Sequence, residues 1–130
     1  MRVLVPVDGS DCSNRALAFA CEFADRFDAE LHVVHFTDEE TDATDQIIGH
    51  AAEVLDEHGV DDEPELLTER DLDGRVEAKV GKEILALVEE GGYDHVVMGH
   101  HGRGAVDRAI LGSAAQVVLR ADEVPVTVIP

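Results

Sequence analysis

Cationic side chains and long apolar segments are what this sequence has least of. Ten lysines and arginines stand against 29 aspartates and glutamates, which gives a formal net charge of −19. Because nucleic acids and anionic membranes are polyanions, this charge argues against either as a partner. No apolar run approaches the roughly 20 residues that cross a bilayer, and no signal peptide precedes the first apolar segment. The sequence therefore predicts a cytoplasmic protein that binds neither nucleic acid nor membrane.

Cysteine is scarce as well, with two in 130 residues. Cys12 and Cys21 both fall in the first predicted helix, nine residues apart. At about 100° per residue they point to opposite faces of that helix, so we expect no disulfide between them. Cys21 lies in the apolar stripe and is expected in the core, whereas Cys12, in the first turn, is a candidate for an exposed thiol. This pattern is typical of an intracellular protein with reduced thiols.

Short apolar segments alternate with helical patterns along the whole chain. The apolar segments are rich in β-branched residues, and the stretches between them repeat apolar residues at helical spacing. This alternation predicts one domain, residues 1–130, with an open five-stranded parallel sheet covered on both faces by helices. The prolines at both ends of the last strand favour an edge position. The expected strands are residues 2–7, 30–36, 65–70, 94–98 and 124–130, and the expected helices are residues 11–27, 42–58, 75–92 and 112–120.

The stretch from Gly99 to Ser113 carries the strongest functional signal. A short apolar strand leads into it, glycines follow at Gly99, Gly102 and Gly112, and a helical pattern begins at its end. Glycines let the main chain pass close to a ligand, and the N-terminus of the following helix favours an anion such as phosphate. The serine hydroxyl adds a donor and can also cap the helix. The alternative is structural, because such glycines often serve only the turn and such a serine only the cap.

Two parts of the sequence resemble the universal stress protein family. Gly99, Gly102, Gly112 and Ser113 match the Gly-x2-Gly-x9-Gly-Ser/Thr pattern of its nucleotide-binding branch. Residues 5–10, Val-Pro-Val-Asp-Gly-Ser, match the way many members begin. The resemblance covers essentially the whole chain and implies a Rossmann-like fold of the adenine nucleotide alpha hydrolase type, with strand order 3-2-1-4-5. It also implies a homodimer built through the last strand. The connection at residues 71–82 is a few residues longer than is usual in the family.

The same resemblance implies a site for ATP or AMP at the carboxyl ends of the strands. Asp8, at the tip of the first strand, is expected to contact the adenosine part, and main-chain groups near Phe36 to contact adenine. The alternative for Asp8 is a turn aspartate that bonds its own backbone. Mg²⁺ or Mn²⁺ is expected to bind through the phosphate oxygens. Gly99 is expected against the ribose, and the residues expected near the phosphates are Gly102, Arg103, Gly112, Ser113 and Ala114.

Three functions compete on this interpretation. The first is a stress-response module that binds an adenine nucleotide and changes its contacts accordingly. The second is a slow ATPase or autokinase at the same site, which ranks lower because no carboxylate or histidine in the motif is placed as a base for an attacking water. The third is a dimeric interaction protein without a ligand, which the intact glycine pattern disfavours. His100 and His101 are adjacent in a glycine turn, and such pairs rarely converge on one metal ion.

The acidic residues are spread over the periodic segments rather than gathered in a tail. The surface itself is therefore predicted to be acidic, as in a halophilic protein of a salty cytoplasm. At molar salt the screening length is about 3 Å, so repulsion within the chain is quenched and an anionic nucleotide can still approach.

Overall fold

The computed structural model describes residues 1–68, 76–101 and 111–130. Strands and helices alternate in these residues as the sequence predicts. Three expected positions, residues 69, 70 and 75, lie outside the described residues. The strands are β1 (Arg2–Pro6), β2 (Glu30–Thr37), β3 (Glu65–Thr68), β4 (His95–Gly99) and β5 (Val126–Ile129), and the helices are α1 (Asp11–Phe27), α2 (Asp42–Glu57), α3 (Val76–Gly91) and α4 (Ser113–Ala121).

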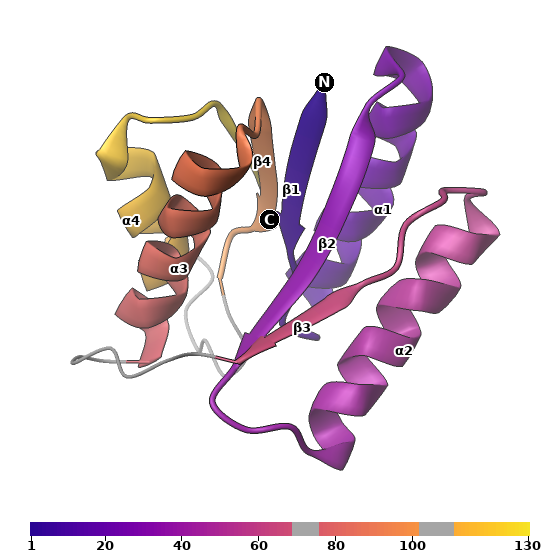
Figure 1. Cartoon of the computed structure of the whole chain (residues 1–130), viewed down its shortest axis with the longest axis horizontal. Helices are drawn as coiled ribbons and strands as arrows, with labels where there is room; N and C mark the ends of the chain where they lie inside the picture. Colours follow the sequence, from indigo (N-terminus) through magenta and orange to yellow (C-terminus); the bar gives the residue numbers. More distant parts are fainter. Residues whose placement is uncertain (69–75, 102–110) are drawn as a thin grey trace.

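The sheet has the predicted strand order, β3-β2-β1-β4-β5, and its neighbouring strands pair in parallel. Helices α1 and α2 cover one face of this sheet, while α3 and α4 cover the other (Figure 1). Strand β1 has β2 on one side and β4 on the other. The chain therefore adds β2 and β3 toward one edge of the sheet, and then β4 and β5 toward the other edge. The carboxyl ends of β1 and β4 flank the point at which open α/β sheets bind ligands.

Each sheet face has its own apolar core. Val3, Val5 and Leu17 belong to the cluster under α1 and α2, and Leu4, Ile84 and Val118 belong to the cluster under α3 and α4. Alternate residues of one strand thus enter opposite cores, which is the pattern of a strand buried on both faces. Among the described residues no helix is both long and apolar enough to cross a membrane.

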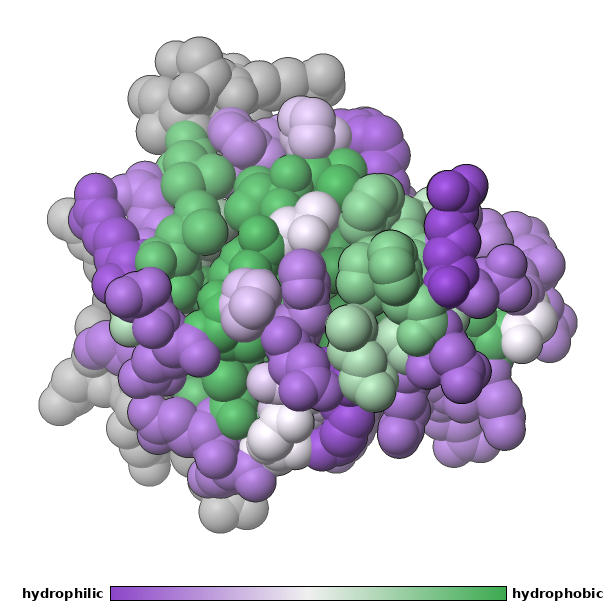
Figure 2. Space-filling view, turned by 90° about the horizontal axis from the view of Figure 1, so that it is seen from above, coloured by the Kyte–Doolittle hydropathy of each residue, from purple (hydrophilic) through white to green (hydrophobic). Residues whose placement is uncertain are grey.

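Helix α1 departs from the expected pattern at its last turn. The helical spacing places Phe27 in the core stripe, but its side chain is 60% exposed. Periodicity predicts the direction in which a side chain points from the helix. It does not predict whether the neighbouring part of the molecule extends far enough to cover that side chain. Figure 2 shows that apolar side chains gather on one face of the molecule among hydrophilic ones.

Cys21, in contrast, is buried as expected and is not in a disulfide. Burial raises the pKa of its thiol to about 11.

The ends of the elements follow from local side-chain chemistry. Thr41 and Thr44 form a capping box at the start of α2, and Gly59, with φ +67°, follows its end. Just before β3 begins, a carboxylate oxygen of Asp62 accepts the Val33 N–H at 3.1 Å and so extends the ladder beside β2. Burial raises the pKa of this carboxyl group.

Candidate functional site

The first part of the site is the turn from β1 into α1. The Ser10 N–H donates to Asp8 Oδ1 at 2.9 Å, and the Asp8 N–H donates to Ser13 Oγ at 3.0 Å. The turn-forming role that was the alternative for Asp8 is therefore present. Gly9, with φ +81°, completes the turn. The result is a partly exposed carboxylate held at the carboxyl tip of β1, where a ligand at the switch point would meet it.

Helix α1 begins with its own cap. Ser10 is the N-cap, and its hydroxyl accepts the Ser13 N–H at 3.2 Å. Asp11 is the first helical residue. The hydroxyls of Ser10 and Ser13 are both used inside this turn, so the start of α1 is stabilised by the chain itself.

The end of β4 lies directly against the first turn of α1. A Cβ atom added to Gly99 would lie 2.8 Å from Cys12 Sγ and 3.0 Å from the Ser13 nitrogen, closer than side chains tolerate. The thiol of Cys12 is fully buried and donates to the His101 carbonyl at 2.9 Å. The expectation of an exposed Cys12 is therefore wrong, because a segment 89 residues away covers it. Gly99 is a glycine because α1 passes so close.

The start of α4 is built differently. Gly112, with φ −61° and ψ 153°, is the N-cap, and no side chain caps the helix. Ser113 is the first helical residue, so the alternative in which it only caps the helix is wrong, since Gly112 already has the extended conformation of a cap. The Gly112 N–H donates to the His100 carbonyl at 2.8 Å, which closes the base of the loop between β4 and α4. The positive end of the α4 dipole therefore lies at Gly112 and Ser113.

Helix α3 fixes the position of α4 through a glycine. A Cβ atom on Gly81 would lie 2.6 Å from Val117 Cβ and 3.2 Å from the Ala114 carbonyl oxygen. The structure thus gives Gly81 a packing role. Because α3 touches α4 at this point, the start of α4 is held by the core and not only by its loop.

The main chain of Phe36 faces the same edge of the sheet. The Val7 N–H donates to the Val34 carbonyl at 2.8 Å, so the main-chain groups of Val34 point toward β1. Two residues later those of Phe36 point the same way, beyond the last paired residue of β1. The Phe36 ring is buried in the core under α3 and α4. Main-chain groups of Phe36, and not its ring, are therefore placed to meet a ligand.

Three hydrogen bonds join the parts of the site. They link Asp8 to Ser13, Cys12 to His101, and His100 to Gly112. The structure thus brings the ends of β1 and β4 and the start of α4 together. Ala114 lies in the first turn of α4 and is partly buried. Gly102 and Arg103 lie outside the described residues.

Several histidine side chains make structural contacts in and near the sheet. Nδ1 of buried His35 bonds the Val7 carbonyl at 2.7 Å and steadies the end of β1, a contact that no sequence pattern indicates. His32, three residues earlier in the strand, points to the other face of the sheet, and its Nε2 bonds Glu65 Oε2 at 2.9 Å. The rings of His100 and His101 are nearly perpendicular, at 84°. Among the described residues no three or more His, Cys, Asp and Glu side chains form a metal site.

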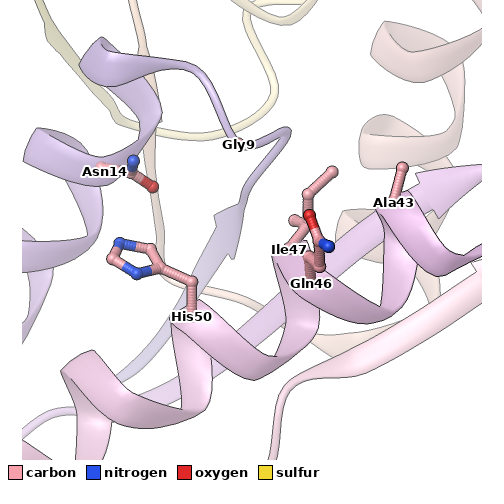
Figure 3. Close-up of a pocket in the computed structure, with 6 residues that line it drawn as sticks. All are labelled: Gly9, Asn14, Ala43, Gln46, Ile47 and His50. Atoms are coloured by element: carbon pink, nitrogen blue, oxygen red, sulfur yellow. The ribbon is translucent and has the colours of Figure 1, made fainter.

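Sequence reasoning also missed a pocket of about 250 Å³ between α1 and α2. Figure 3 shows Asn14 of α1 and His50 of α2 pointing toward one another, with Gly9 on the loop nearby. No motif marks these residues, because the pocket arises from two helices packed side by side. It is lined by Gly9, Asn14, Ala43, Gln46, Ile47 and His50.

Comparison with known proteins agrees with this architecture. The model of the Universal stress protein family matches residues 1–130. Universal stress protein MJ0531 of Methanocaldococcus jannaschii is 27% identical over an alignment of 146 positions, which includes 98% of this chain and 81% of that protein.

Two solved structures show the same fold. A universal stress protein in complex with cAMP is 23% identical, with a TM-score of 0.77 over 99% of this chain and 95% of its own. The universal stress protein from Archaeoglobus fulgidus in complex with dAMP is also 23% identical, with a TM-score of 0.75 over 100% of this chain and 98% of its own. Because the family model spans every residue, the chain belongs to the universal stress protein family.

Proposed function

We propose that this protein binds an adenine nucleotide, ATP or AMP, across the carboxyl edge of its sheet, and that the bound nucleotide regulates its contacts in a stress response. The observation that carries the proposal is the start of α4, which follows a glycine-rich loop and has no side-chain cap. A helix start of this kind favours a phosphate group. The complexes of two structural neighbours with cAMP and dAMP support an adenine nucleotide as the ligand.

The ligand would extend from α4 toward β2. Its phosphates would lie at Gly112, Ser113 and Ala114, where the absence of a side chain at Gly112 leaves room for close approach. The ribose would lie over the ends of β4 and β1, near Gly99 and Asp8. Adenine would reach the main chain of Phe36. Gly102 and Arg103 remain candidates for the phosphates by their place in the motif.

A divalent cation fits this arrangement only through the nucleotide. Since the described residues contain no cluster of three acidic, histidine or cysteine ligands, Mg²⁺ or Mn²⁺ would be held by phosphate oxygens and water. Ser113 offers a hydroxyl at the first position of α4, where it would hydrogen-bond a phosphate oxygen or the cation's water.

The protein is further proposed to be a homodimer through β5. This strand is at the edge of the sheet, and its outer side offers backbone groups to a second strand. Two copies related by a two-fold axis would pair antiparallel through residues 125–129. We also infer that the acidic surface is an adaptation to a salty cytoplasm, so binding and assembly are best measured in molar potassium chloride.

The nucleotide site is tested by Gly112→Val in titration calorimetry with ATP and Mg²⁺. Branched carbons would occupy the place of the phosphate, so binding should become undetectable while the fold is kept. Ser113→Ala should lose one charge-assisted hydrogen bond, on the order of 1–3 kcal/mol. Gly49→Val is the matched control, because a Cβ at this position in α2 meets nothing within 4 Å, and it should bind normally. Wild-type affinity in folded Gly112→Val would refute the site.

A further inference from the structure

Helix α1 carries a row of three aromatic side chains, Phe19, Phe23 and Phe27, which we call the aromatic row. Neighbouring ring centroids are 6.3 Å and 4.6 Å apart. Phe19 is 38% exposed and Phe27 is 60% exposed. On a chain with a net charge of −19, large exposed aromatic rings are an unexpected use of surface. Neither the nucleotide site nor the core accounts for them.

The aromatic row lies on the side of α1 that faces the β5 edge. The Phe23 ring is 5.4 Å from the ring of His95 in β4. His95 Nε2 in turn hydrogen-bonds Thr127 Oγ1 in β5 at 2.7 Å. Ile129 of β5 packs against the same apolar cluster as Phe23. The row is therefore continuous with the face of β5 that α1 covers.

Strand pairing through β5 would be too small to hold a dimer alone. The strand has four residues, whereas a standard interface uses roughly 20–30 residues on each side. More surface must be buried beside the strands if the dimer is stable. Each large aromatic side chain can bury about 150–250 Å².

The symmetry of the dimer determines which surface is buried beside the paired strands. Two identical edge strands that pair antiparallel in one continuous sheet are related by a two-fold axis perpendicular to the sheet. This axis keeps both copies of α1 on the same face, one on each side of the seam. The aromatic row of one copy would then face the aromatic row of the other.

The charge of the surface around the row also favours a second copy of this chain as the partner. Residues 124–130 contain no charged side chain. The charged residues three or four positions from members of the row on α1 are Arg15, Glu22 and Arg26. Arg15 Nε also donates to the Pro130 carbonyl at 2.8 Å, next to the end of β5. Across a two-fold axis this surface meets its own copy, so an uncharged strand lets two strongly negative chains pair without placing like charges opposite one another.

We propose that the aromatic row of α1 is the helical half of the dimer interface and packs against the same row of a second copy across the two-fold axis. This inference rests on the proposed homodimer. Helix α1 would then contact the second copy. Because α1 starts one turn after Asp8, the same helix begins at the proposed nucleotide site. Assembly and ligand binding would then share one rigid element.

The experiment is sedimentation equilibrium in molar potassium chloride with four proteins. Phe27→Glu places a charge on the exposed end of the row and should raise the dimer dissociation constant on the order of 30-fold or more, as for an interface hot spot. Ala52→Glu adds the same charge on exposed α2 and should leave dimerisation unchanged. Val128→Pro removes a main-chain donor on the outer side of β5 and should give monomer. Wild type is the reference, and circular dichroism checks each fold.

The outcomes separate the two proposals. A monomeric Val128→Pro together with a fully dimeric Phe27→Glu would overturn the role of the aromatic row and leave the β5 dimer standing. A monomeric wild type would overturn both. Weakened dimers in both variants, with Ala52→Glu unaffected, support the row as part of the interface.

Discussion

Helices α1 and α4 start at the same edge of the sheet, after neighbouring strands, yet their first turns are built in opposite ways. At α1, the Ser10 hydroxyl accepts the Ser13 N–H, and Ser13 Oγ accepts the Asp8 N–H. At α4 the cap is Gly112, which has no side chain to offer. Of the three helix starts that lie within the described residues, those of α1 and α2 have side-chain caps and that of α4 has none.

The difference separates a structural helix start from a binding one. A helix whose first N–H groups are satisfied by its own side chains gains stability, typically about 1 kcal/mol for the cap. A helix that gives up this cap keeps its dipole available to an anion from outside. We therefore propose that α1 holds the end of β4 in place and that α4 receives the phosphates.

The largest expected effect comes from giving α4 the kind of cap that α1 has. Gly112→Asp fits the extended conformation of Gly112 and supplies an N-cap oxygen, which should raise stability by a few tenths of a kcal/mol. The same carboxylate would occupy and repel the phosphate, so affinity for ATP should fall about 100-fold or more, or roughly 2.7 kcal/mol. Thermal melting and titration calorimetry measure the two effects separately.

The control for this prediction is Gly112→Ala, which adds neither a cap nor a charge. It should bind more tightly than Gly112→Asp and melt at or below the wild-type temperature. If Gly112→Asp keeps wild-type affinity for ATP, the proposed contrast between the two helix starts is wrong, and the phosphates lie elsewhere.

A smaller effect should come from the contact that α1 makes with β4. Gly99→Ala puts a carbon 2.8 Å from Cys12 Sγ and 3.0 Å from the Ser13 nitrogen. Since the neighbours are a helix backbone and a buried thiol, they cannot move freely, and the cost should be about 1–3 kcal/mol of unfolding free energy. Urea denaturation measures it. Gly49→Ala, in open space on α2, should be neutral or slightly stabilising, and an equal loss there would show that the effect is not packing.

The fold could be predicted almost entirely from the sequence because it depends on repeated local signals. Apolar segments and helical stripes gave the elements, and the edge position of β5 followed from its prolines. The strand order came from the family resemblance, and the structure confirms it. Phe27 shows the limit of this reasoning, since its spacing matches the core stripe while its ring is exposed.

The site could be predicted only in part, because its detail depends on contacts between distant segments. The glycine motif indicated Gly99 and Gly112, and the match at residues 5–10 indicated Asp8. The structure places all three at one edge of the sheet. Nothing local to Cys12 indicates that the His101 carbonyl covers it. Likewise, the pocket beside His50 exists only because α2 packs against α1. Such features belong to the packing of elements and not to any one of them.

The smallest expected effect comes from removing the cap of α1. Ser10→Ala takes away the acceptor of the Ser13 N–H, which should cost about 1 kcal/mol and lower the melting temperature by about 4 °C. Because α1 is proposed to hold the site and not to bind the phosphates, affinity for ATP should stay within about twofold at molar salt, well below one tenfold step of 1.4 kcal/mol. Ser10→Thr keeps a cap hydroxyl and should recover most of the melting temperature. A tenfold loss of affinity in Ser10→Ala without a change in melting would assign the start of α1 to the ligand instead.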